Sequence, residues 1–280
     1  EALATEARAR GSTARVHIKV DTGMGRVGVG WEQAVPFIQE ACRTPGIAVE
    51  GIYTHLATAD ERDKSFAREQ LARFGRVLQR LEQIGIRGLL RHAANSGAIL
   101  DLPEAYFDLV RPGVSLYGYY PSTETSESIP LRPAMTFKTR VAFVKDVPAG
   151  TPLSYGRTFV TDRPTRIATL PVGYADGYNR LLSNRGEVLI GGRRYPVVGR
   201  VCMDQILVDV GPNGPVQVGD EAILFGRQGQ EEISVRSLCE KLNTIPYEIT
   251  CWVSKRVPRV YVDDGGQSEG AERPDTREQG

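Results

Sequence analysis

Cysteine and histidine, the usual zinc ligands, are scarce in this sequence. The 280 residues include four cysteines and three histidines, no two cysteines form a C-x-x-C pair, and no histidine lies near a cysteine. Zinc sites draw on closely spaced cysteine and histidine ligands, so we expect no metal site. Widely separated cysteines are typical of reduced, mostly buried thiols in the cytoplasm. They are Cys42, Cys202, Cys239 and Cys251.

The sequence also lacks a strong net charge and long apolar runs. The formal net charge is +1, and basic residues are scattered rather than grouped with aromatic residues, so we expect no nucleic-acid partner. No apolar run approaches the roughly 20 residues that span a bilayer, so we expect no membrane partner. Residues 1–10 resemble neither a signal nor a transit peptide and do not begin with Met. These features predict a cytoplasmic protein whose sequence is truncated at its N-terminus.

The first half of the chain alternates between short β-branched runs and helical patterns. Apolar residues of the longer helix share one stripe, and Asp60 is its expected N-cap. Alternation of strands and helices favours a parallel sheet, whose functional residues lie at the carboxyl ends of the strands, as in βα barrels. The expected strands are 16–20, 49–55, 88–92 and 109–111, and the expected helices are 31–42 and 61–84.

From about Leu131 the pattern becomes strand-like, with one late helix at 235–242. Gly191-Gly192 is suited to a hairpin turn between two strands. The fold class is therefore α/β plus all-β, with a partial barrel domain at 1–130 and a β domain at 131–262. The last segment, 263–280, has one aliphatic side chain and should be disordered. The expected strands of the β domain are 137–147, 166–172, 187–190, 194–198, 205–210 and 221–225.

Polar residues follow the expected strands of the first half. The hydroxyl of Ser96 and the backbone N–H groups of Gly113 and Val114 form a workable phosphate cradle. A single strand-end histidine or arginine is more often structural, but several at one face favour a functional site. The strand-end residues are Lys19 and Arg26, His55, His92 and Ser96, and Arg111.

From about Val16 to Tyr261 the sequence resembles the alanine racemases, which are pyridoxal-phosphate enzymes of fold type III. The shared motifs, in chain order, are HIKVDTGMGR (17–26), YTHLATAD (53–60), ANS (94–96), VRPG (110–113), SYG (154–156), GYADG (173–177), GRVCMDQ (199–205) and RVPR (256–259). The resemblance implies the C-terminal half of a (β/α)8 barrel, strands 5–8, followed by a compact β domain. It also implies an amino-acid substrate, a homodimer with shared active sites, and interconversion of L- and D-alanine to supply peptidoglycan synthesis.

The resemblance assigns the groups that move protons. Racemisation needs one base that removes the Cα proton and a second group that returns a proton to the opposite face. In the family one base is the imine-forming lysine and the other is a tyrosine of the partner subunit, here Tyr155. His55 is implied to hydrogen-bond that tyrosine and to be held by Arg111. Arg111 is also implied to face the pyridine nitrogen, which it keeps unprotonated because a guanidinium only donates.

The resemblance also assigns binding residues. Ser96, Gly113 and Val114 would bind the cofactor phosphate, and Lys255 stands where several relatives have a phosphate-contacting tyrosine.

Arg26 and the backbone N–H of Met203 from the partner would position the substrate carboxylate, with Asp204 adjacent. Tyr174 would narrow the entrance, or else be a core aromatic residue. Lys19 matches a position that is carbamylated in some relatives, and a plain ammonium salt bridge is the alternative.

The imine lysine is the main departure from the family pattern. None of the six lysines lies in the family's V-x-K-A-x-A-Y-G context, so we expect the chain to begin just before the fifth barrel strand and to be inactive alone. A serine or broad-spectrum racemase and a degenerate, non-catalytic cofactor-binding scaffold remain alternatives. A basic amino-acid decarboxylase of the same fold type would place an acid opposite the pyridine nitrogen, so Arg111 argues against it.

Overall fold

The computed structural model describes residues 1–262, so the expected disorder of 263–280 lies outside the described residues. The chain forms two compact units, which are considered separately here. The first unit contains Glu1–Phe137 and Ser234–Glu248, and the second contains Lys138–Ile233 and the residues from Ile249 onward. Within residues 1–262 no helix is long and apolar enough to cross a membrane.

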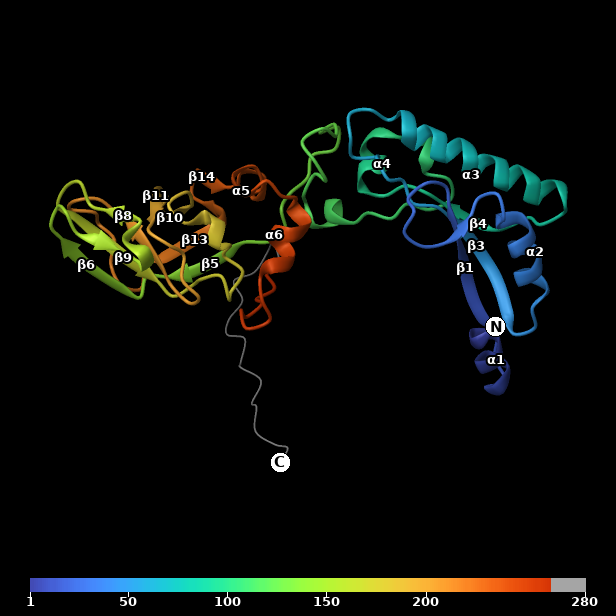
Figure 1. Cartoon of the computed structure of the whole chain (residues 1–280), viewed down its shortest axis with the longest axis horizontal. Coiled ribbons are helices and arrows are strands. Elements are labelled where there is room, and N and C mark those ends of the chain that lie inside the picture. Colours follow the sequence, from blue (N-terminus) through green and yellow to red (C-terminus); the bar gives the residue numbers. More distant parts are fainter. Residues whose placement is uncertain (263–280) are drawn as a thin grey trace. The chain divides into compact units, whose positions relative to one another are not determined.

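The first unit contains a four-stranded sheet in the order β2-β1-β3-β4, of which Figure 1 labels β1, β3 and β4. All of its strand pairs are parallel, as the alternation of strands and helices predicts. The expected strand at 109–111 is instead a single bridge between Leu109 and His92, and Pro112 directly follows that segment. A proline has no N–H for a ladder, which favours this early end. The strands are β1 (Ala14–Asp21), β2 (Val29–Gly30), β3 (Ile47–Tyr53) and β4 (Leu90–His92).

Helices α2 and α3 cover one face of this sheet, and Figure 1 shows them beside β1 and β3. Ile38 of α2 and Phe74 of α3 are buried against Ile18, Val20 and Ile52 of the strands. The apolar stripe predicted from the sequence therefore forms the core. The helices of the unit are α1 (Ala2–Ala9), α2 (Ala34–Arg43), α3 (Ser65–Gln83), α4 (Ser96–Asp101) and α5 (Val235–Leu242), with 3-10 turns η1 (Pro103–Ala105) and η2 (Val114–Tyr117).

The predicted cap of the long helix is wrong. Helix α3 begins at Ser65, with Lys64 rather than Asp60 at its N-cap position. The Ser65 N–H donates to the Asp63 carboxylate at 2.8 Å. An Asp–Ser turn therefore satisfies one of the donors that the helix leaves unpaired at its start.

The second face of the sheet carries the polar side chains of the strands. Cross-strand pairing sets His17 beside Gly51, and Lys19 beside Tyr53 and then His92. Because side chains alternate along a strand, these residues lie opposite the face that packs on α2 and α3. Ile18 and Ile52, which alternate with them, are in the helix-covered core. The alternation of side chains therefore places the polar residues of three strands on one surface of the sheet.

The second unit is built on antiparallel strands in the order β14-β13-β10-β11-β12-β9-β6, with β5 paired to β13. Gly191 and Gly192 form the two-residue turn between β10 and β11, both at positive φ, as predicted. The expected single strand at 137–147 is instead two strands that pair with different partners. The strands are β5 (Phe137–Arg140), β6 (Phe143–Val147), β7 (Pro152–Leu153), β8 (Phe159–Val160), β9 (Thr165–Leu170), β10 (Glu187–Ile190), β11 (Arg193–Val198), β12 (Ile206–Asp209), β13 (Glu221–Gln228) and β14 (Glu231–Ile233).

Three short helical elements complete the chain: η3 (Tyr155–Arg157), η4 (Arg180–Leu182) and α6 (Pro246–Trp252). The helix predicted at 235–242 is present as α5, and Ser234 caps it by accepting the N–H of Ser237. Helix α6 was not expected from the sequence. Its first residue is Pro246, which is compatible with a first helical position because no N–H partner is needed there.

Candidate active site

The Arg111 side chain is anchored by three hydrogen-bonding contacts in the first unit. Its Nη1 lies 2.7 Å from Nδ1 of His92, and its Nη2 donates to the carbonyls of Thr54 at 2.9 Å and Ala93 at 3.1 Å. Its guanidinium also lies 5.4 Å from the ring centre of Tyr53, a favourable cation–π separation. The arginine is therefore held at the carboxyl ends of β3 and β4.

This arrangement corrects the expected link between Arg111 and His55. Within residues 1–262 the hydrogen-bonded histidine partner of Arg111 is His92, not His55. His92 is 6% exposed, and its ring stacks on Tyr53 with centroids 4.8 Å apart and planes at 4°. The sequence places both histidines at strand ends, and only the spatial order of the strands distinguishes them. His92 is a site residue to which the sequence assigned no role.

A second cluster of cationic residues surrounds His55. The pKa of His55 is lowered to about 4, by burial first and then by the nearby charges of Arg111, Arg26 and Lys19, although Asp60 opposes the shift. The pKa of Lys19 is also lowered, by burial first and then by Arg26, although Asp21 opposes the shift. His55 is thus neutral at pH 7, and its surroundings carry positive charge. Such a site favours anionic ligands.

The residues of the proposed phosphate cradle lie next to one another. Ser96 is buried at the first turn of α4, and its Oγ accepts the backbone N–H groups of Gly113 at 2.8 Å and Ser115 at 3.3 Å. The N–H of Gly113 was expected to be free and is instead donated to Ser96. Val114, the other backbone donor expected in the cradle, is the first residue of η2. The Ser96 hydroxyl oxygen is thus already bonded by two backbone N–H groups, and the Tyr247 side chain is a further hydrogen-bond partner of Ser96.

The second unit brings Tyr174 and Met203 together. The turn at 173–177 is bonded to the loop at 202–204: Tyr174 N–H donates to the Cys202 carbonyl at 3.0 Å, and Ala175 N–H donates to the Met203 carbonyl at 3.1 Å. Gly173 lies so close to this loop that a Cβ there would overlap both carbonyls. Tyr174 is 44% exposed and Met203 is 53% exposed. The alternative of a core aromatic residue at Tyr174 is therefore wrong.

Tyr155 is joined to the same loop region. It begins η3 directly after Ser154, whose φ of +60° lies in the left-handed region. Ser154 Oγ donates to the carbonyl of Arg200 at 2.7 Å, and Gly199 is in close approach to Ser154. These contacts fix the backbone while the Tyr155 side chain is 71% exposed. A phenol presented outward from a strained, well-anchored turn is suited to a partner outside this unit.

Arg256 connects two of the matched motifs in the second unit. It bonds Asp176 at 2.7 Å and Asp204 at 2.5 Å, and the other oxygen of Asp176 accepts the N–H of Gly173 at 2.8 Å. The orientation of Asp204 is therefore set by an ion-pair network that the sequence did not reveal. Lys255 precedes Arg256 and is exposed.

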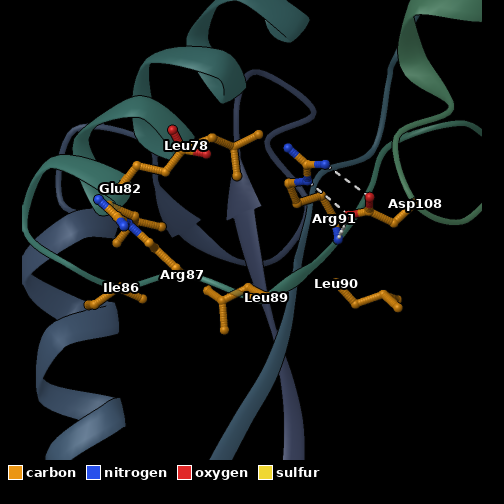
Figure 2. A pocket seen from close by; sticks show the side chains of 10 residues that line it. Leu78, Glu82, Ile86, Arg87, Leu89, Leu90, Arg91 and Asp108 are labelled. Carbon is orange, nitrogen blue, oxygen red and sulfur yellow. Dashed lines mark hydrogen bonds and ion pairs between the residues drawn. The ribbon is translucent and has the colours of Figure 1, made fainter.

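A cavity of the first unit lies away from His92 and Arg111. It has a volume of about 560 Å³ and is lined by the C-terminal half of α3, residues 86–91 and Asp108. Figure 2 shows Leu78 and Glu82 of α3 above Leu89 and Leu90, with the Arg91–Asp108 ion pair at one side. This cavity opens at the amino end of β4, whereas His92 and Arg111 lie at the carboxyl end. Functional residues of parallel sheets gather at the carboxyl end.

The cysteines differ from the sequence expectation. All four are free thiols, but Cys42 and Cys251 are exposed, Cys202 is half-buried and Cys239 alone is buried. The prediction of mostly buried thiols is wrong, because helices α2 and α6 turn Cys42 and Cys251 outward. Within residues 1–262 no group of three or more histidine, cysteine, aspartate or glutamate side chains is placed to hold a metal ion.

The fold and the site define a two-unit protein, with a cationic site at the ends of parallel strands in the first unit and antiparallel strands in the second. The family description "Alanine racemase, N-terminal domain" matches residues 1–121, and "Alanine racemase, C-terminal domain" matches residues 134–261. The chain belongs to the alanine racemase family. The resemblance carried by the sequence motifs is thereby confirmed.

Individual relatives agree with this assignment. Alanine racemase 2 of Caldanaerobacter subterraneus subsp. tengcongensis is 52% identical over 91% of this chain and 66% of that protein. Alanine racemase of Desulforamulus reducens is 54% identical over 93% of this chain and 70% of that protein. The solved alanine racemase of Clostridium difficile 630 has a TM-score of 0.88 at 39% identity, covering 95% of this chain and 69% of its own. The chain thus spans about two thirds of the length of these relatives.

Proposed function

We propose that the protein interconverts L-alanine and D-alanine by a two-base reaction that depends on pyridoxal 5'-phosphate. The observation that carries the proposal is the anchoring of Arg111 on His92 and two carbonyls at the strand ends. Decarboxylases of the same fold type would need an acid at this point. A permanently charged donor opposite the pyridine nitrogen suits an enzyme that exchanges the Cα proton and catalyses no side reaction.

The residues at the strand ends fit the cofactor. Arg111 uses three of its five N–H groups on His92, Thr54 and Ala93, which leaves donors for an acceptor such as a pyridine nitrogen. The Ser96 hydroxyl and the Val114 N–H are suited to a phosphate dianion beside η2. Lys255 would add a positive charge to that phosphate. When bound, the cofactor makes the Cα proton of the amino acid acidic enough to be removed.

Tyr155 and the imine-forming lysine would be the two bases. Tyr155 is 71% exposed on a well-anchored turn, so its phenol oxygen is free to reach the site of a second copy. We therefore propose a homodimer with shared active sites, in which neutral His55 accepts or holds the proton of the partner's Tyr155. Burial, and then the nearby charge of Arg111, keep that imidazole neutral and able to accept a proton.

The substrate carboxylate would be bound by charge and by backbone donors. Arg26 supplies a guanidinium in the cationic cluster around His55, and the Met203 N–H and Asp204 would come from the partner. Tyr174 would narrow the entrance. Lys19 would be carbamylated, because burial and the neighbouring Arg26 lower its pKa, and the uncharged amine is the form that reacts with CO2.

The architecture supports a finer proposal for the fold. Strands β1, β3 and β4, with the segment at 109–111 that is bridged to His92, would be strands 5–8 of a (β/α)8 barrel forming a cofactor domain over residues 1–130, followed by a β domain over 131–262. The polar face that carries His17, Lys19 and Tyr53 would then line the barrel interior. A cytoplasmic location and a supply of D-alanine for peptidoglycan accompany this function.

The test is a racemase assay on the full-length protein, including any residues that precede Glu1. With pyridoxal 5'-phosphate bound, L-alanine should yield D-alanine, and a Tyr155→Phe variant should bind the cofactor yet lose most of this activity. Turnover of serine or of many amino acids in preference to alanine would support the broad-spectrum alternative. Cofactor binding without turnover of any amino acid would support the scaffold alternative and overturn the proposal.

A further inference from the structure

A third residue extends the contact between Arg111 and His92. Nδ1 of His17 lies 2.7 Å from Nε2 of His92, while Nδ1 of His92 lies 2.7 Å from Nη1 of Arg111. Both separations are within hydrogen-bond range for nitrogen atoms. The chain of contacts runs across the polar face from His17 of β1 through His92 of β4 to Arg111, and the proposed function gives His17 no role.

The direction of every proton in this chain follows from Arg111. A guanidinium can only donate, so Nδ1 of His92 must present its lone pair to Arg111. A neutral imidazole has one donor and one acceptor, so the His92 proton is on Nε2 and points at His17. Nδ1 of His17 must then accept, and the His17 proton lies on its own Nε2. Any other assignment sets two N–H groups, or two lone pairs, against each other at 2.7 Å.

The surroundings hold both rings in this arrangement. Gly51 lies beside His17 on β3, and a Cβ at Gly51 would overlap the His17 ring. The ring of Tyr53 stacks almost parallel to the ring of His92 and restricts its orientation. The pKa of His92 is lowered to about 4 by burial, by Arg111 and by His17, in agreement with a neutral ring that bonds at both nitrogens.

We propose that His17 is a positioning residue of the proposed racemase site. Nδ1 of His17 accepts the Nε2–H of His92, and this bond keeps Nδ1 of His92 as the acceptor for Arg111. The expected effect of His17 on turnover rests on the proposed function, whereas the arrangement of protons on the two rings does not. Without an acceptor at His17, the buried N–H of His92 would lose its partner. The ring would then turn or change tautomer, and Arg111 would lose the contact that points its free N–H groups toward the site.

The first test reads the protons directly. In the full-length protein with 15N-labelled histidine, the imidazole nitrogen spectra of His17 and His92, assigned with single histidine variants, should both show the neutral form protonated at Nε2. The result should hold with and without bound pyridoxal 5'-phosphate. A proton on Nδ1 of either ring, or a charged His17 at pH 7, overturns the proposal.

The second test separates positioning from packing. His17→Leu fills the space without an acceptor, whereas the amide oxygen of His17→Asn can take the place of Nδ1. Leaving a buried donor unpaired should lower kcat by about tenfold or more in His17→Leu with little change in KM, and His17→Asn should recover most of it. Arg15→Gln is the matched control, because Arg15 lies on the same strand in an exposed ion pair with Glu50, and its kcat should stay near wild type.

The two proposals fail in different ways. An inactive wild-type enzyme contradicts the proposed function and leaves the histidine spectra to judge the proton chain. An active wild type with equal kcat in His17→Leu, and with unchanged His92 signals, contradicts the role of His17 alone. Equal losses in His17→Leu and His17→Asn show that ring packing, not acceptance, is what the site needs, and this also overturns the proposal.

Discussion

The shape of the Arg111 side chain and its charge have separable effects, which two substitutions at this position distinguish. Arg111→Lys keeps the positive charge but replaces a planar fork by a single nitrogen. That nitrogen cannot reach His92, Thr54 and Ala93 together, whereas Arg111 now bonds all three at 2.7–3.1 Å. Arg111→Gln removes the charge as well. The proposed function requires the planar guanidinium with its several N–H donors. The pKa values of His55 and His92 depend instead on the positive charge at this position.

The expected sizes follow from these contacts. Loss of one preorganised electrostatic contact costs about 2.7–4 kcal/mol of barrier, or roughly 100–1000-fold in kcat, and Arg111→Lys should fall in this range. The pKa values of His55 and His92, both about 4, should stay low in Arg111→Lys. In Arg111→Gln they should rise toward 6.5 without reaching it, because burial is the larger cause of both shifts.

Two measurements check this expectation on the same proteins. Production of D-alanine from L-alanine gives kcat, and NMR titration of the histidine ring signals gives the two pKa values. Near-normal turnover of Arg111→Lys would refute the need for the fork. Unchanged histidine pKa values in Arg111→Gln would refute the claim that the guanidinium charge contributes to them.

Three further predictions follow from the structure. Because folded His55 and His92 have pKa values near 4 and unfolded histidine has about 6.5, the unfolded chain binds more protons between these values. The free energy of unfolding should be highest above pH 6.5 and should fall between pH 6.5 and pH 4 by up to about 1.4 kcal/mol per pH unit for each histidine. A free energy of unfolding in urea that does not change over this range contradicts the lowered histidine pKa values. In the second prediction, mixing inactive Tyr155→Phe subunits with inactive Arg111→Gln subunits should restore activity through one intact site per heterodimer, and heterodimers without activity would exclude a shared site. Finally, a methyl group at Gly173 would overlap the carbonyls of the 202–204 loop, so Gly173→Ala should destabilise the protein by about 1–3 kcal/mol, and a melting temperature equal to wild type would contradict this close approach.

Much of the local structure was determined by sequence pattern alone. The apolar stripe of α3 and the β-branched runs of β1 and β3 have the periods of a helix and of buried strands, and they form the core in which Phe74 packs against the strands. Gly191-Gly192 predicted its hairpin because two adjacent positive φ angles exclude most other residues. The motifs around Ser96, Arg111 and Tyr174 were identifiable because their residue types and order are themselves the signal.

The tertiary structure alone decided which of these residues meet. His55 follows the end of β3 and His92 ends β4, and only the order of the strands, together with the path of the chain to Arg111, makes His92 the bonded partner. Likewise, Arg256 joins Asp176 and Asp204 across 80 and 52 positions of sequence. Sequence periodicity reports the face on which a side chain lies, because that depends on neighbouring residues. A hydrogen bond between distant segments depends on how those segments pack, and no local pattern of residues encodes it.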